Sequence, residues 1–183
     1  MNNNAMFCRQ CQETFGNVGC TRVGVCGKKP ETSALMDGLV ARLEELAAER
    51  RMTPTLGRFV TCALFMTLTN ANFDDERLKQ AIVEAERHLG HPWTRRLPRA
   101  FEESDEDIRS LKELTLFGLK GIAAYAHHAA MLGREDEAIY AFLFRALKAI
   151  GESKTVMQLT ELVLECGRVA VKTMELLDGA NVG

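Results

Sequence analysis

Residues 6–30 read MFCRQCQETFGNVGCTRVGVCGKKP, and this stretch holds four of the six cysteines of the chain. The four are Cys8, Cys11, Cys20 and Cys26, in the spacing C-x2-C-x8-C-x5-C. Glycines stand between or beside them, and no helical or strand period runs through the segment, so a sharply turning loop is expected. Four thiols gathered in one short loop predict a metal site.

Three interpretations of these thiols compete. Disulfides are disfavoured, because no signal peptide precedes the loop and disulfides are rare in reducing compartments. Structural zinc accepts four cysteines but usually takes them as two close pairs, and only one close pair is present. A CCCH zinc finger fails because Pro30 stands where its histidine would be. An iron–sulfur cluster is wider than one ion, tolerates uneven gaps and is favoured, with zinc left as the alternative.

The loop resembles the amino-terminal cluster motif of the hybrid-cluster proteins, also known as prismane proteins or hydroxylamine reductases. Their motif consists of MFC-x-QC, a following GC and VCGK-x-PE, and this chain has MFCRQC and GCTRVGVCGKKPE in the same register. The resemblance implies a 4Fe–4S cubane on Cys8, Cys11, Cys20 and Cys26. Members with wider gaps carry a 2Fe–2S centre, which the short gaps here disfavour.

Size and composition fit a helical globular protein. The chain has 183 residues, 46% of them hydrophobic and 26% charged, which is enough for a core without covalent staples. A net charge of −2 gives no basic footprint for nucleic acid. No apolar run approaches the length of a membrane span. We expect a soluble, cytoplasmic chain, and we leave the leader MNNNA out of the interpretation.

Apolar residues at helical spacing predict a first three-helix bundle over residues 32–90. Thr53 before Pro54 is typical of a helix start, with the threonine as cap and the proline in the first turn. Asp74 is placed to cap the third helix, and Gly90 is expected to end it.

A second three-helix bundle is predicted over residues 104–183, after a linker at 91–103 that contains two prolines. Ser104 is expected to cap the long fourth helix and Ser153 the sixth. Gly179 is expected to end the sixth helix. The predicted fold class is therefore all-α.

The resemblance extends along nearly the whole chain, through TLTNANFDD, EDIRSLKELTLFGLKGIAAYAHHAAMLG and VLECGRVAVKTMELLDGAN. It implies the family's first domain, in which two three-helix bundles carry a cubane held by a cysteine-rich loop, here residues 1–31. Full-length members continue into two α/β domains whose His, Glu and Cys residues hold the catalytic hybrid cluster, whereas this chain ends at Gly183. No catalytic residue can therefore be assigned.

The expected function is a 4Fe–4S electron-transfer module without the catalytic domains. A hydroxylamine reductase, as a fragment or as one subunit of a full enzyme, is the alternative. A zinc-stabilised helical module that binds a protein partner is a third possibility, from outside redox chemistry.

The remaining cysteines and the paired histidines are interpreted as structural. Cys62 and Cys166 stand alone on predicted helices, and free cysteine is among the most buried residue types. His127 and His128 are adjacent on a helix and point about 100° apart, so they do not share one small ion. We expect one of the two to be packed and the other to face solvent.

Association is expected through the second bundle. Phe117 and the leucines of the fourth helix occupy more of its circumference than three helices can bury. Leu162, Val169 and Leu176 lie away from the main apolar stripe predicted for the core side of the sixth helix, which consists of Val156, Leu159, Val163, Ala170, Met174 and Leu177. Since large exposed apolar patches are rare on soluble monomers, we expect a homodimer or a complex with a redox protein.

Overall fold

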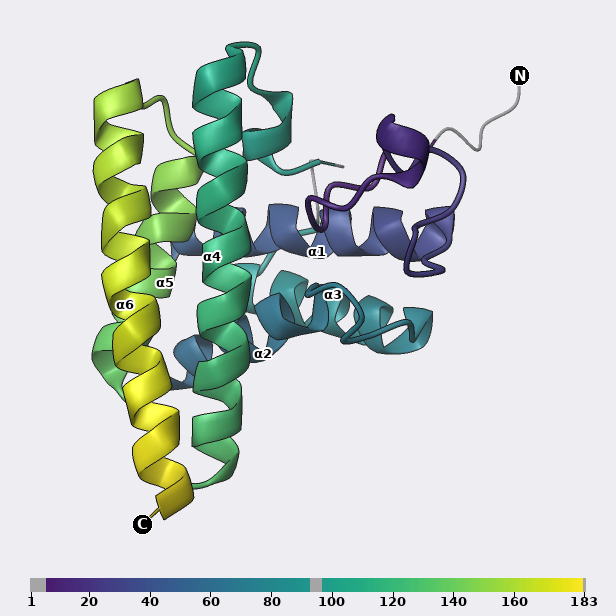
Figure 1. The fold of residues 1–183 in the computed structure, drawn as a ribbon. Helices are drawn as coiled ribbons and strands as arrows, with labels where there is room; N and C mark the ends of the chain where they lie inside the picture. The colour runs from purple at the N-terminus through teal and green to yellow at the C-terminus, as the bar shows by residue number, and fades with distance from the viewer. Residues whose placement is uncertain (1–5, 93–96, 183) are drawn as a thin grey trace.

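The computed structural model describes residues 6–92 and 97–182. Within these residues the regular secondary structure is entirely helical (Figure 1). The predicted leader and part of the predicted linker lie outside the described residues. The all-α prediction is confirmed, and no described helix is both long and apolar enough to cross a membrane. In chain order the elements are η1 (Phe15–Asn17), α1 (Pro30–Glu49), α2 (Pro54–Met66), α3 (Asp75–Leu89), η2 (Arg99–Glu102), α4 (Glu106–Met131), α5 (Glu137–Ile150) and α6 (Val156–Val182).

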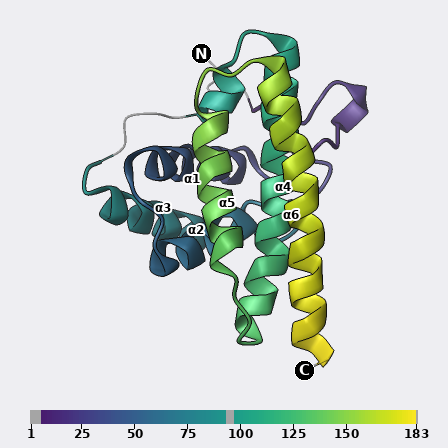
Figure 2. The same ribbon diagram turned by 90° about the vertical axis from the view of Figure 1, so that its left-hand side faces the viewer.

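The six α-helices form two groups that cross each other. Helices α4, α5 and α6 stand side by side, while α1, α2 and α3 run across them, and the cysteine loop lies beside α1 (Figures 1 and 2). One hydrophobic cluster takes buried side chains from all six helices, so the two groups share a core. The contact between α2 and α5 is close, because a Cβ at Gly57 would lie 2.6 Å from Cγ of Tyr140. Whether the two groups fold as separate bundles stays a prediction.

The helix ends of the first group follow the sequence. Thr53 Oγ1 accepts a hydrogen bond from the Leu56 amide at 3.3 Å, directly before Pro54. Asp74 accepts hydrogen bonds from two amides in the first turn of α3, and Gly90 ends that helix with a φ of 77°. These three predictions are confirmed, because each rests on a local hydrogen bond or on a left-handed backbone that glycine adopts readily.

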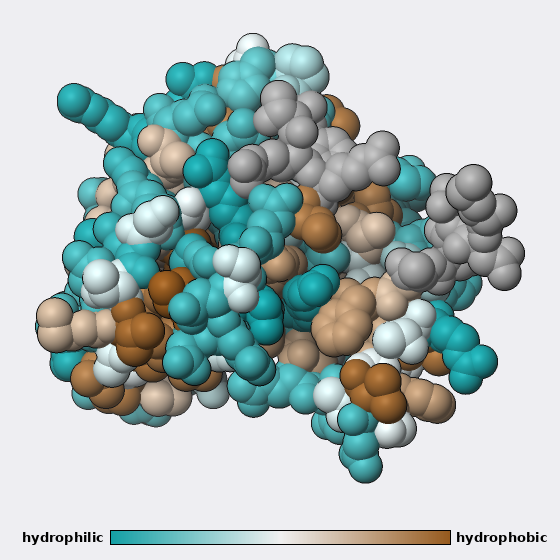
Figure 3. Space-filling model, turned by 90° about the horizontal axis from the view of Figure 1, so that it is seen from above, coloured by the Kyte–Doolittle hydropathy of each residue, from teal (hydrophilic) through white to brown (hydrophobic). Residues whose placement is uncertain are grey.

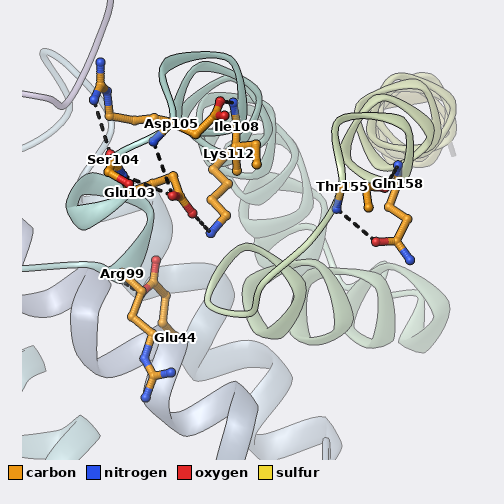
Figure 4. A network of polar contacts seen from close by, with 10 residues as sticks. Glu44, Arg99, Glu103, Ser104, Asp105, Ile108, Lys112, Thr155 and Gln158 are labelled. Carbon is orange, nitrogen blue, oxygen red and sulfur yellow. Dashed lines mark hydrogen bonds and ion pairs between the residues drawn. The ribbon is translucent and has the colours of Figure 1, made fainter.

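Three predicted helix ends in the second group are wrong by a few residues. Asp105, not Ser104, caps α4, and its carboxylate accepts from the Ile108 amide at 3.0 Å (Figure 4). Thr155, not Ser153, caps α6, since Thr155 and Gln158 exchange two hydrogen bonds between side chain and backbone (Figure 4). A cap must stand directly before the first turn, and in each case a closer residue takes the role.

Helix α6 continues through the expected stop at Gly179 as far as Val182. Its buried face also differs from the predicted one, because Leu162 is buried and Val169 and Leu176 pack against the core. By contrast Met174, which was expected on the core side, is exposed. Helix α4 lies along α6, and residues three, four and seven apart on α6 face it.

The predicted linker is partly folded onto α1. Glu44 on α1 accepts the Arg99 amide at the start of η2 at 2.7 Å (Figure 4), and Ala100 and Phe101 are buried in the shared core. Burial raises the pKa of Glu44 to about 7. The segment after Pro98 therefore fixes the first helical group against the beginning of α4.

Candidate metal centre

The cysteine loop closes on itself through its backbone and through close glycine contacts. The amide of Cys8 donates to the carbonyl of Cys20 at 3.1 Å, which ties the first cysteine pair to the third cysteine. Gly19 has a φ of 128°, and a Cβ there would lie 2.9 Å from Cε2 of Phe7. A Cβ at Gly24 would lie 3.0 Å from Cys26 Sγ. Both positions therefore need glycine for the loop to reach this closed form.

The structure brings the four predicted cysteines to one cavity. Cys8, Cys11, Cys20 and Cys26 all line a hollow of about 450 Å³ between the loop and the turn that joins α2 to α3. Cys20 is buried, and the other three thiols are half-buried. Their role as ligands stays a prediction, but their convergence is a feature of the fold.

The other two cysteines do not line this cavity. Cys62 lies half-buried on α2. Cys166 is buried on α6 against α4, and burial raises the pKa of its thiol to about 11. A Cβ at Gly118 of α4 would lie 2.5 Å from the Cys166 sulfur, so the thiol fills the place that this glycine leaves open. Packing accounts for Cys166.

The four thiols are spread more widely than a single zinc ion requires. Zn–S bonds of about 2.3 Å in a tetrahedron put neighbouring sulfurs roughly 3.8 Å apart. Among the described residues, the triad of potential ligand atoms within 4.8 Å of one another is Glu45, Glu49 and His91, and no three of the cysteine sulfurs meet that limit. The four thiols therefore line one cavity without forming a ready-made tetrahedral zinc site.

The group of Glu45, Glu49 and His91 lies at the surface and contains an ion pair between His91 and Glu49. His91 Nε2 lies 3.0 Å from Glu49 Oε2, and this hydrogen bond raises the pKa of His91. The side chains are exposed or half-exposed, and exposed pairs of this kind contribute little to stability.

A buried network of hydrogen bonds connects the cysteine loop to the helices. Gln10, between the first two cysteines, donates to Asp37 on α1 and accepts from Lys120 on α4. Lys120 also donates to the Thr67 carbonyl at 3.4 Å. The network joins the loop to α1, to α4 and to the end of α2.

Burial shifts the pKa values of both charged ends of this network. It raises the pKa of Asp37 to about 7 and lowers that of Lys120 to about 8. The Asp37 carboxylate and negative charge on the sulfurs of Cys8 and Cys11 oppose the second shift, because negative charge favours the ammonium form, whereas the positive charge of Lys28 adds to it. Sequence inspection missed these residues, although a lysine within the apolar run of α4 was an available signal.

A second lysine lies at the cavity itself. Lys28, two residues after Cys26, is 1% exposed and is part of the cavity lining. Its Nζ lies 4.7 Å from the ring centroid of Phe73 and has no hydrogen-bond acceptor among the described residues. Thr69 and Asn70, from the same TLTNANFDD segment as Phe73, complete this wall of the cavity.

The paired histidines lie elsewhere. His127 is half-buried and His128 is exposed, as expected, and both rings pack near Phe65, with centroids 5.4 and 5.2 Å away. Burial lowers the pKa of His127. Neither residue lines the cavity of the cysteine loop.

The fold and the loop define a helical protein with four cysteines around one partly open cavity. Among known families, the model of the Prismane/CO dehydrogenase family matches residues 6–183, and the chain belongs to this family.

Its relatives include proteins named hydroxylamine reductase. Those of Desulfovibrio desulfuricans and Methanocella arvoryzae are 43% and 39% identical to it, across 98% and 97% of this chain. The chain spans only 39% and 40% of the length of these two relatives.

Proposed function

We propose that this chain is an iron–sulfur electron-transfer module in which Cys8, Cys11, Cys20 and Cys26 hold a 4Fe–4S cluster. The observation that carries the proposal is the convergence of four thiols on one cavity, at a spacing wider than zinc requires. Membership of the Prismane/CO dehydrogenase family supports iron–sulfur chemistry. Such a cluster supplies one-electron transfer when it is bound.

The cysteine loop has a buried inner side and a more exposed outer side. Cys20 and Gln10 are buried, and Gln10 holds the inner side of the loop to Asp37 on α1 and to Lys120 on α4. Cys8, Cys11 and Cys26 are half-buried, so the outer side of the loop stays near solvent. A redox partner can therefore approach the site from the loop side, where Phe7 is exposed.

Hydroxylamine reduction is the second candidate, because the relatives carry the name hydroxylamine reductase. A cluster with four thiolate ligands leaves no coordination position for a substrate. The chain also spans about two fifths of those relatives. We therefore propose electron delivery, not substrate reduction, as the role of this four-thiolate site.

The outer face of α6 is the proposed association surface. Met157, Leu164 and Val171 are exposed there at intervals of seven residues, which places them along one side of the helix. On the face seen in Figure 3, apolar side chains reach the surface in separate patches among polar ones. These three exposed apolar side chains, separated along the helix by polar residues such as Glu161 and Arg168, favour contact with a second copy of the chain or with a redox protein.

Single replacements of the loop cysteines by alanine test the ligand assignment. Each should lower the iron retained after anaerobic reconstitution, because each removes one of four thiolates. Cys62→Ala is the matched control and should keep the iron content of the wild type. Full iron content in a loop-cysteine variant, or iron loss in the Cys62 control, would contradict the assignment.

A further inference from the structure

Lys28 is an unusual residue to find at the wall of this cavity. A lysine is almost never fully buried unless it is paired, because moving an ammonium out of water is costly. Lys28 is nevertheless 1% exposed, and its Nζ donates to no acceptor among residues 6–92 and 97–182. The ammonium instead lies over the face of Phe73, which recovers part of the lost hydration.

Lys120 provides the comparison within the same site. It is as buried as Lys28, but its Nζ donates to Gln10 and to the Thr67 carbonyl, and the Asp37 carboxyl lies on the far side of Gln10. The positive charge of Lys120 is thus matched by a polar network. Lys28 lacks such a match and lies in the lining together with the four cysteines.

We propose that Lys28 is the charge-compensating residue of the cluster site, and that its ammonium sets how readily the site accepts an electron. This inference rests on the proposed function, since four thiolates around a 4Fe–4S core leave the oxidised site with a net negative charge. Reduction takes one electron from an external donor, breaks no bond and makes the site one charge more negative. A buried ammonium at the wall stabilises the reduced site more than the oxidised one.

Lys28→Met tests the inference, because methionine keeps an unbranched apolar stem like that of lysine while removing the charged amine. Lys29→Met is the matched control. It removes the same charge one residue further on, but Lys29 is exposed, so water already screens it.

The reduction potential of the reconstituted protein is the main readout, from a dye-mediated titration followed by electron paramagnetic resonance. A unit charge within roughly 10 Å, at an effective dielectric constant of about 20, changes the equilibrium constant for reduction about tenfold. Lys28→Met should therefore lower the potential by about 59 mV, the value of a tenfold change for one electron. Lys29→Met should stay close to the wild type.

The thermal unfolding of the metal-free protein separates this role from a structural one. If Lys28 serves the cluster, Lys28→Met should leave the metal-free chain as stable as the wild type or more stable, because an unmatched buried charge has been removed. A lower unfolding temperature would instead show that Lys28 holds the fold together, and would overturn the inference.

The remaining outcomes distinguish this inference from the proposed function. Wild-type protein that takes up no iron would refute the proposed function, and this inference with it. Iron-loaded wild type and Lys28→Met with equal potentials would refute this inference alone. So would a control Lys29→Met that shifts the potential as much as Lys28→Met does.

Discussion

Replacing Gly118 by alanine should destabilise the protein when Cys166 is present and stabilise it when Cys166 is absent. The change of sign follows from the contact between α4 and α6. A Cβ at position 118 would lie 2.5 Å from the Cys166 sulfur but 3.9 Å from the Cys166 Cβ. The first distance is a clash and the second an ordinary contact. Cys166→Ala removes the sulfur and leaves the Cβ.

The size of the effect follows from two opposing terms. Overpacking a filled site costs about 2 kcal/mol, whereas alanine in place of glycine within a helix contributes about 1 kcal/mol. Gly118→Ala alone should therefore cost about 1 kcal/mol. In the Cys166→Ala background the clash is absent, and the same change should gain about 1 kcal/mol.

Thermal unfolding followed by circular dichroism measures both backgrounds. For a chain of this size, 1 kcal/mol corresponds to a shift of about 3 °C, so Gly118→Ala should lower the midpoint by that amount in one background and raise it in the other. The two changes are then strongly non-additive, as expected for residues in contact. Equal shifts of the same sign in both backgrounds would refute the packing role that the structure gives to Cys166.

Three further predictions concern pH, association and turnover. Burial raises the pKa of the Glu44 carboxyl above its value in the unfolded chain. The free energy of unfolding should therefore fall by up to about 3 kcal/mol as the pH rises from 4.5 through 7. In unfolding measured as a function of pH, Glu44→Gln should flatten this dependence. Light scattering of the iron-loaded protein at micromolar concentration should give the mass of two chains, and the mass of one chain would contradict a homodimer. The isolated chain with reduced viologen should not turn over hydroxylamine faster than a loop-cysteine variant does, and steady turnover above that level would overturn its assignment to electron delivery.

The sequence predicted the helices well because their signals are local. Pro54, Asp74 and Gly90 mark helix ends through their own backbone preferences or hydrogen bonds, and all three act as expected. The errors at Ser153 and Gly179 arose where two candidate residues stood close together, or where a glycine was tolerated inside a helix. The buried face of α6 was misjudged because α4, which determines it, is far away in sequence.

In the candidate site, too, the sequence predicted local features but not contacts between distant residues. Spacing alone grouped the four cysteines, since the loop that carries them is short. The polar network of Gln10, Asp37 and Lys120 joins positions up to 110 residues apart, and no sequence period records such a contact. The burial of Lys28 likewise depends on Phe73, which the turn before α3 brings back to the loop.

Iron and acid-labile sulfide analysis of anaerobically purified protein tests the central claim most directly. Four thiolates around one cavity should yield about four irons and four sulfides per chain, with little zinc. Stoichiometric zinc in protein produced with adequate iron would contradict the iron–sulfur assignment and would favour a zinc-stabilised helical module instead.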